Sequence, residues 1–285
     1  MSAAWSAGAA ARALSAHVSP RRVSRLRDVA ARRLADTVLL LENLSDARNL
    51  SACLRTADAL GVHHVLLVER WGCAALVPSV DKGVGKWLAL RRFAVTADAL
   101  QFARRDLGCA AVIATALAPG ATPLSRAVRG SVAGALPGSP RPRVCLAFGS
   151  EHRGVSAALR AAADACVYVP QAGFVESFNV SVAVGIVASA FCRRTPDYEE
   201  ALVESRGGGL VTLAAAPADG PLPAHAAATQ AAPAAPLAGD PRSVGPHVEH
   251  LGAADQEALL LSMLLVAVPN AEKILERKGL RPPDL

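Results

Sequence analysis

An asparagine and an arginine lie six residues apart in the segment NLSACLR, which runs from Asn49 to Arg55. Apolar residues recur at helical spacing over 50–60, and Asn49 is a favoured N-cap, so the pattern predicts a helix here. Ser51, Arg55 and Asp58 would share the face opposite the apolar stripe. On that face Arg55 could form a surface ion pair with Asp58 three residues further on.

A second polar segment, FGSEHRG at 148–154, follows an apolar run and carries two glycines around a charged turn. Gly149 would allow the backbone to approach a ligand closely, and Ser156 is placed to cap the helix that follows. The same pattern also fits an ordinary turn without a ligand.

A third polar segment, VPQAGFVESFN at 169–179, leads into a long apolar run. Ser177 and Asn179 stand where that run would begin as a helix. Asn179 can be a plain N-cap, and the free N–H groups of such a helix start also attract carboxylates or phosphates.

Short apolar runs alternate with helical patterns along the middle of the chain. Strands are expected at 38–41, 65–68, 110–116, 144–148 and 166–169, and helices at 20–35, 96–106, 157–163 and 179–194, with a long loop at 118–142. This alternation indicates an α/β protein with a parallel sheet covered by helices on both faces. Ligands of such sheets bind at the carboxyl ends of the strands, where all three polar segments would gather.

The three segments resemble, in order and wording, the three signature motifs of the SpoU family of RNA 2′-O-methyltransferases. They read NLSACLRTADALG, FGSEHRG and VPQAGFVESFNVSVAVGIV, and the resemblance spans residues 20–200. The stretch 82–91 (KGVGKWLALR) looks most like the TrmH subgroup, which methylates guanosine 18 of tRNA, and the tail ILERKGLRPPDL resembles the C-terminal extension of some members. The resemblance implies the SPOUT fold with a C-terminal trefoil knot, a homodimer, and S-adenosyl-L-methionine as the methyl donor.

The resemblance also implies roles for individual residues. It makes Arg55 the catalytic cation and gives supporting positions to Asn49, Glu151, Ser177 and Asn179. Because arginine stays protonated in proteins, Arg55 is expected to bind the neighbouring phosphate and to stabilise alkoxide charge, and Glu151 to hold Arg55 or the partner subunit. The donor is expected to be held mainly through the backbone of Thr115, Ala116, Leu117, Gly149, Val169, Pro170 and Phe178, where the family usually has leucine in place of Phe178.

The chain has 285 residues, of which 52% are hydrophobic, and a formal charge of +6. Seven arginines and a single acidic residue lie within 1–35, so the excess positive charge sits in an N-terminal arm that could attract a polyanion. The six cysteines form no CxxC pair or Cys/His cluster, and we therefore expect no metal site. A G-x-G-x-x-G motif after the first strand and a P-loop are both absent, which argues against a nucleotide-dependent enzyme.

Composition divides the chain into four parts. These are a basic arm or helix at 1–36, a methyltransferase domain at 37–204, a disordered Ala/Pro-rich linker at 205–254 and a helical extension at 255–285. In the last part, Pro269 is expected to start a second helix. No apolar run reaches the ~20 residues of a membrane span, so no membrane contact is expected. The first 27 residues contain no acid and also fit a transit peptide, which leaves the cytoplasm or an organelle (chloroplast or mitochondrion) open.

The expected function is S-adenosylmethionine-dependent 2′-O-methylation of a tRNA ribose, most consistent with guanosine 18 in the D loop. Two alternatives stay open: a ribosomal RNA 2′-O-methyltransferase, and a non-catalytic RNA-binding protein. A short basic arm and a C-terminal helix suit a compact tRNA, which is an argument by analogy and size.

Overall fold

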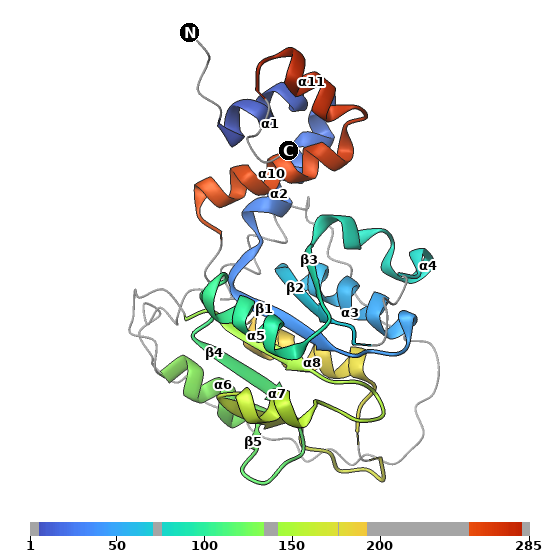
Figure 1. Ribbon diagram of the computed structural model, residues 1–285, viewed down its shortest axis with the longest axis vertical. Coiled ribbons are helices and arrows are strands. Elements are labelled where there is room, and N and C mark those ends of the chain that lie inside the picture. The colour runs from blue at the N-terminus through green and yellow to red at the C-terminus, as the bar shows by residue number, and fades with distance from the viewer. Residues whose placement is uncertain (1–5, 71–75, 134–141, 176, 193–250, 281–285) are drawn as a thin grey trace, which may run out of the picture.

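The computed structural model describes residues 6–70, 76–133, 142–175, 177–192 and 251–280. Its centre is a seven-stranded sheet in the order β3-β2-β1-β6-β4-β7-β5, in which every neighbouring pair is parallel (Figure 1). Strand β1 (Leu34–Glu42), which lies inside the sheet, is almost wholly buried, as its apolar run requires in a sheet covered on both faces. The strands are β1 Leu34–Glu42, β2 Val62–Val68, β3 Ala89–Phe93, β4 Ala111–Thr115, β5 Thr122–Pro123, β6 Val144–Phe148 and β7 Ala165–Tyr168.

Helices cover both faces of the sheet, which confirms the predicted layers. On one face lie α3 (Ala47–Leu60), α6 (Leu124–Ala133) and α8 (Val180–Phe191), whose apolar side chains share one core with the strands. On the other face lie α5 (Thr96–Arg105) and α7 (Ala157–Ala162), which share a second core. Between β2 and β3 the chain forms α4 (Pro78–Asp81) and a 3₁₀ turn, η1 (Val84–Trp87).

The two ends of the chain meet in a separate helical cluster, which we call the terminal module (Figure 1). It consists of α1 (Ala7–Ser15), α2 (Pro20–Ala31), α10 (Ala253–Ala267) and α11 (Ala271–Arg277). Leucines from all four helices fill its core: Leu14, Leu26, Leu264 and Leu275 are each at most 8% exposed. The apolar faces of α1 and α2 are therefore covered by a segment from the far end of the chain.

Several predicted boundaries are wrong for local reasons. The helix expected over 50–60 begins one turn earlier, because the Asp46 side chain accepts a hydrogen bond from the Arg48 amide and so takes the cap position expected of Asn49. The expected loop 118–142 contains α6, whose Leu124 and Val128 are buried against the sheet core. Pro269 lies before the second tail helix, since Asn270 occupies the cap position.

The parallel register aligns the carboxyl ends of the strands. Glu42 pairs with Val68, Val68 with Phe93, and Leu41 with Phe148, so the segments that follow these strands leave from the same edge. This edge brings together the polar segments that are far apart in the sequence.

The apolar helices of the chain are short. Within the described ranges, no single helix is long and apolar enough to cross a membrane. The pair α10 and α11, bent by 115° at its break, passes the same test of length and composition only when the two are taken together.

Two partly buried histidines on β2 make the stability of the fold sensitive to acid. Burial lowers the pKa of His63 to about 3, with help from His64 and Arg33, and burial lowers the pKa of His64 to about 4. The native state therefore holds both rings neutral, whereas in the unfolded chain they take up protons near pH 6.5. Their stabilising contribution is complete above pH 6.5 and is lost progressively as the pH falls towards 4.

We expect the free energy of unfolding to decrease between pH 6.5 and 4, by at most about 1.4 kcal/mol per pH unit for each histidine. Urea unfolding at a series of pH values measures this slope. His63→Phe should flatten it, because the phenyl ring has no proton to bind, while His17→Gln on the exposed surface should not. An equal slope in all three proteins would contradict the assignment.

Candidate functional site

A chain of side-chain hydrogen bonds joins the three polar segments at the carboxyl edge of the sheet. The Asn49 amide donates to Glu151 Oε1 over 2.8 Å, and the Asn179 amide donates to Asn49 Oδ1 over 3.1 Å. Ser45, which precedes α3, donates to Glu151 Oε2 through its amide and its hydroxyl. The structure thus places three of the five predicted catalytic residues in contact.

These hydrogen bonds hold Glu151 in its charged form. Partial burial alone would raise the pKa of this carboxyl, but hydrogen bonds from Asn49, from the backbone of Glu151 and from Ser45 lower it below its usual range. The carboxylate is therefore ionised at neutral pH and its acceptor atoms are occupied by neutral donors. The expectation that Glu151 holds Arg55 within one subunit finds no such contact here.

Asn179 also starts the helix that follows, as predicted. Its Oδ1 accepts hydrogen bonds from the Ser181 amide over 2.9 Å and from the Ser181 hydroxyl over 2.6 Å. The one side chain therefore caps α8 and bonds α3, so the start of α8 is positioned relative to the start of α3.

A cavity of about 490 Å³ opens beside this hydrogen-bond chain; we call it the donor cavity. Its walls come from the ends of β4, β6 and β7 and from the segment that leads into α8. The lining residues include most of the positions predicted to hold the methyl donor: Thr115, Ala116, Leu117, Gly149, Val169 and Phe178. Pro170 is not among its lining residues, and Gln171 lines the cavity instead.

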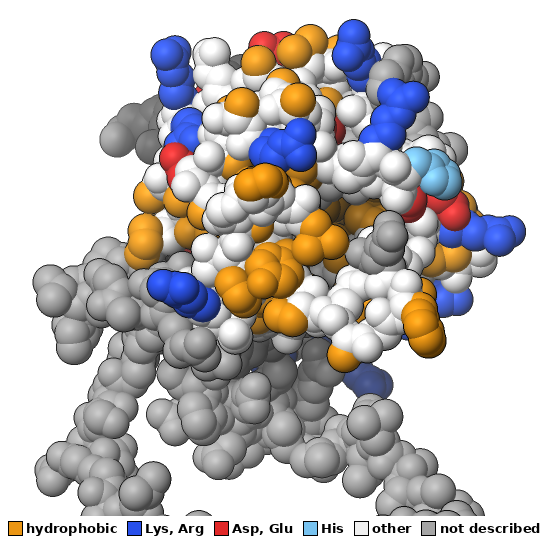
Figure 2. Space-filling model, turned by 90° about the horizontal axis from the view of Figure 1, so that it is seen from below, with side chains coloured by type: hydrophobic (Ala, Val, Ile, Leu, Met, Phe, Trp, Pro, Cys, Tyr) orange, Lys and Arg blue, Asp and Glu red, His pale blue; other side chains and the backbone are white. Residues whose placement is uncertain are grey.

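The remaining predicted residues divide between the cavity and its surroundings. Ser177 and Glu151 line the donor cavity, whereas beside it Asn49 donates to Glu151 and Asn179 donates to Asn49. The side chain of Phe178 is 38% exposed and that of Leu117 is 70% exposed, so the apolar surface of the cavity continues onto the outside of the molecule (Figure 2).

The turn at 149–154 brings its two backbone segments so close together that only glycine fits at position 149. Ser150 and Gly154 exchange two backbone hydrogen bonds, and a Cβ on Gly149 would lie 1.9 Å from the carbonyl carbon of Gly154. Backbone cannot move away as a flexible side chain can, so no other residue fits without rebuilding the turn. This turn forms one wall of the donor cavity.

Gly149→Ala is expected to displace the turn and to weaken donor binding at least tenfold, since the wall formed by 149–154 must shift. Isothermal titration with S-adenosylmethionine measures the loss, and Gly173→Ala, where a Cβ meets nothing within 4 Å, is the matched control. Equal donor affinity in the two variants would show that the turn does not shape the cavity.

Arg55 stands apart from this network. Its side chain is exposed, and it has no hydrogen bond or ion pair with any residue that the structure describes. The predicted surface ion pair between Arg55 and Asp58 is wrong, because the Asp58 carboxylate instead accepts a hydrogen bond from Arg33 over 2.6 Å. The prediction that Ser51 lies on the face opposite the apolar stripe is also wrong. Ser51 is fully buried, and its hydroxyl accepts a hydrogen bond from the Val77 amide.

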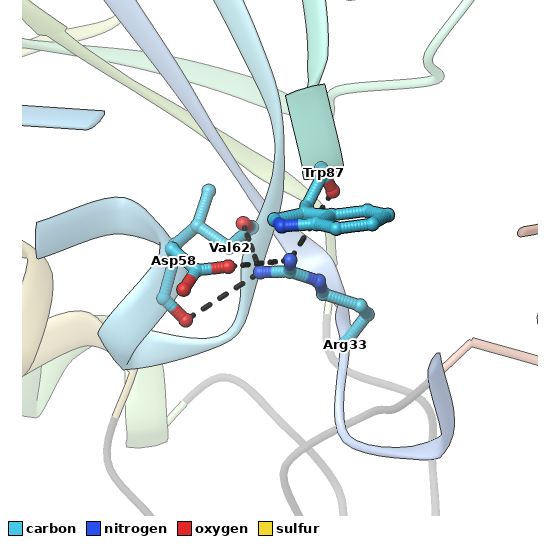
Figure 3. Close-up of polar contacts among 4 residues, drawn as sticks. All are labelled: Arg33, Asp58, Val62 and Trp87. Atoms are coloured by element: carbon cyan, nitrogen blue, oxygen red, sulfur yellow. Dashed lines mark hydrogen bonds and ion pairs between the residues drawn. The ribbon is translucent and has the colours of Figure 1, made fainter. Parts of the chain in front are cut away.

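Arg33 is a buried cation that sequence analysis grouped with the basic arm. Only 1% exposed, it donates to the carbonyls of Asp58, Val62 and Trp87 and to the Asp58 carboxylate (Figure 3). It therefore ties the C-terminal end of α3 to β2 and to η1. The signal that could have found it is its place between the terminal helix and the first strand, where a long side chain must enter the core.

Glu42 is a second buried charged residue that was not predicted from the sequence. It ends β1 and is 1% exposed, and its carboxylate accepts from Thr96 Oγ1, from the Ser156 amide and from Ser156 Oγ. It joins the starts of α5 and α7, where a negative charge is favoured. In the described part of the chain, no group of three or more His, Cys, Asp or Glu side chains could hold a metal ion.

The central part of the chain matches a known protein family. A model of the SpoU rRNA Methylase family matches residues 36–189. The tRNA (guanosine(18)-2′-O)-methyltransferase of Thermus thermophilus is 34% identical over 163 residues, which are 57% of this chain and 77% of that protein. The enzyme of the same name from Borreliella burgdorferi is 28% identical over 181 residues, 64% of this chain and 77% of that protein.

The architecture is shared with known structures. The crystal structure of the A. aeolicus TrmH/SpoU tRNA modifying enzyme matches with a TM-score of 0.53 at 24% identity, over 65% of this chain and 94% of that one. The parallel sheet with helices on both faces defines an α/β protein. The chain belongs to the SpoU rRNA Methylase family, as the resemblance of its three motifs predicted.

Proposed function

We propose that this protein transfers a methyl group from S-adenosylmethionine to the ribose 2′-hydroxyl of guanosine 18 in tRNA. The observation that carries the proposal is the hydrogen-bond chain Glu151–Asn49–Asn179, which joins all three motif segments beside a cavity of ligand size. The choice of tRNA is supported by relatives named tRNA (guanosine(18)-2′-O)-methyltransferase.

The donor cavity fits S-adenosylmethionine by size and by lining. Its volume of about 490 Å³ lies within the range of about 300–1,000 Å³ of small-molecule sites. Val167, Val169 and Phe178 offer apolar surface for a purine ring, and the turn at Gly149 brings backbone close to the ligand. When bound, the donor supplies an electrophilic methyl group on a positively charged sulfur.

In the reaction, the ribose 2′-oxygen forms a bond to the methyl carbon, the carbon–sulfur bond breaks, and its electron pair stays on sulfur. The hydroxyl proton leaves to a neighbouring phosphate or to water. Arg55 cannot accept that proton, because a guanidinium stays charged in proteins. We assign it the binding of that phosphate and the stabilisation of negative charge on the attacking oxygen.

The active form in this proposal is a homodimer with a trefoil knot. Large hydrophobic side chains are exposed around the segment that leads into α8, namely Leu117, Phe174, Val175, Phe178 and Val182. Figure 2, which views the end opposite the terminal module, shows hydrophobic side chains gathered near the centre of that face. Such a patch is typical of a subunit interface.

Sedimentation analysis tests the proposed dimer: Phe174→Asp should yield monomers, and a monomeric wild-type protein would refute the dimer.

The deciding experiment is methyl transfer from labelled donor to unmodified tRNA and to ribosomal RNA, with the product mapped by nucleotide. Label on the 2′-oxygen of guanosine 18 supports the proposal. Label in ribosomal RNA, the substrate in the family's name, would keep the chemistry and replace the substrate. No transfer to either RNA by a protein that binds the donor would favour the non-catalytic alternative.

Four exposed arginines lie on α2 of the terminal module: Arg21, Arg22, Arg25 and Arg27. We expect their replacement by glutamine to weaken tRNA binding and to reduce its salt dependence by about one unit of slope for each phosphate that is no longer bound. Filter binding across a salt series measures this.

Deletion of 1–27 is a less specific test, because it also removes Leu14 and Leu26 from the core of the terminal module. If 1–27 act only as a transit peptide, affinity stays unchanged and localisation of the truncated protein changes.

A further inference from the structure

A second cavity, of about 530 Å³, lies at the carboxyl edge of the sheet, on the side covered by α5 and α7. We call it the lateral cavity. Its walls are the segments that follow β1, β2, β3 and β6, and its lining residues include Asn43, Arg70, Val95, Arg153 and Ser156. None of the roles assigned above to the donor or to the catalytic chain uses it.

The wall of the lateral cavity combines apolar surface with positive charge. Ala94, Val95, Ala97 and Ala158 present small hydrophobic side chains, and Val95 is 52% exposed. Arg70 and Arg153 add two exposed guanidinium groups. An apolar wall next to arginines suits a flat base with a phosphate attached, since bases stack on apolar and guanidinium surfaces and phosphates pair with arginine.

Hydrogen bonds hold the side chains at the floor of the cavity in place. Both Glu42 oxygens accept hydrogen bonds, from Thr96 and from Ser156, at 2.6 to 2.8 Å. Asn43 is fixed as well: its amide donates to the Val68 carbonyl, and its Oδ1 accepts from the Arg70 amide over 3.0 Å. The Glu42 carboxylate is therefore buried and held at the floor, while Arg70 and Arg153 supply the positive charge in the cavity wall.

One turn separates the lateral cavity from the donor cavity. Ser150, Arg153 and Gly154 line both. A chain of nucleotides with its reacting ribose at the mouth of the donor cavity would therefore have a neighbouring nucleotide within reach of the lateral cavity.

We propose that the lateral cavity binds an unpaired nucleotide of the RNA substrate, next to the nucleotide that is methylated. The base lies against Ala94, Val95 and Ala97, and its phosphate pairs with Arg70 and Arg153. The inference rests on the proposed function for the identity of the RNA. It adds a site that selects RNA with a single-stranded neighbour at the methylated position.

The test uses residues that line the lateral cavity alone. Ala97→Trp fills it, and Arg70→Ala removes one charge, whereas Arg153 is avoided because it lines both cavities. Ala161→Trp and Arg160→Ala, exposed on neighbouring α7 and outside the lining, are the matched controls. Binding of tRNA is measured in the absence of donor, and donor binding separately.

Ala97→Trp is expected to weaken tRNA binding about tenfold, and Arg70→Ala several-fold with a smaller salt slope, while donor affinity stays that of the wild type. In turnover, the KM for tRNA should rise with little change in the KM for the donor. Affinities for tRNA equal to those of the control variants would overturn the proposal. If the wild type methylates no RNA but Ala97→Trp still weakens RNA binding, the proposed function fails and the lateral cavity stands.

Discussion

Arg55→Ala is expected to lower kcat for methyl transfer to tRNA by about 10²- to 10³-fold, the usual effect of removing one preorganised group that stabilises charge in the transition state. Asn49, Glu151 and Asn179 form a chain of hydrogen bonds, and none of them carries a positive charge that could replace that of Arg55. The loss should therefore fall on turnover, as measured with saturating donor and tRNA.

The fold and the donor cavity should survive this substitution. Arg55 is exposed, has no hydrogen bond or ion pair among the described residues, and does not line the donor cavity. Urea midpoint and donor affinity should match those of the wild type, and Arg105→Ala on α5 should keep full turnover. Turnover retained by Arg55→Ala would remove the mechanism proposed here and leave the fold assignment untouched.

Arg33→Met is expected to lower the free energy of unfolding by about 2–4 kcal/mol, because it removes one partner of a largely buried ion pair and leaves carbonyls without a donor. Asp58 is 30% exposed, so water can reach it and the cost stays below that of a fully buried pair. The carbonyls of Val62 and Trp87, in contrast, lose a donor inside the structure (Figure 3).

Urea unfolding at neutral pH measures this effect, with Arg22→Met on the exposed face of α2 as the control, expected within about 0.5 kcal/mol of the wild type. Arg33→Lys should recover only part of the loss, since one ammonium cannot reach four acceptors in the plane of a guanidinium. A wild-type midpoint in Arg33→Met would mean that the contacts of Arg33 contribute nothing to stability.

The layers of the fold were predictable because they follow from local patterns. Short apolar runs separated by helical spacing require a buried parallel sheet, and Gly61, in the left-handed conformation, ends α3 just after Leu60. The helix α6 was missed because proline and glycine lie on both sides of it in the sequence, although Leu124, Ala127 and Val128 recur at helical spacing; its burial against α8 and the sheet stabilises it.

The site and its surroundings were only partly predictable, because their side-chain contacts join residues that are far apart in the chain. Asp58 pairs with Arg33, 25 positions away, in place of the neighbour three residues before it. Ser51 is buried because the Val77 amide needs an acceptor. No local spacing rule contains such partners. The catalytic roles of Arg55, Ser177 and the others stay predictions that the experiments above decide.

The terminal module has a consequence for how the protein is made. The apolar faces of α1 and α2 leave the ribosome before α10 and α11, which cover them and lie more than 200 residues further along the chain. Until α10 and α11 have been made, Leu14 and Leu26 are open to solvent and to other chains, while the sheet between them can already fold. A nascent chain is therefore expected to need protection at α1 and α2 until α10 and α11 are released.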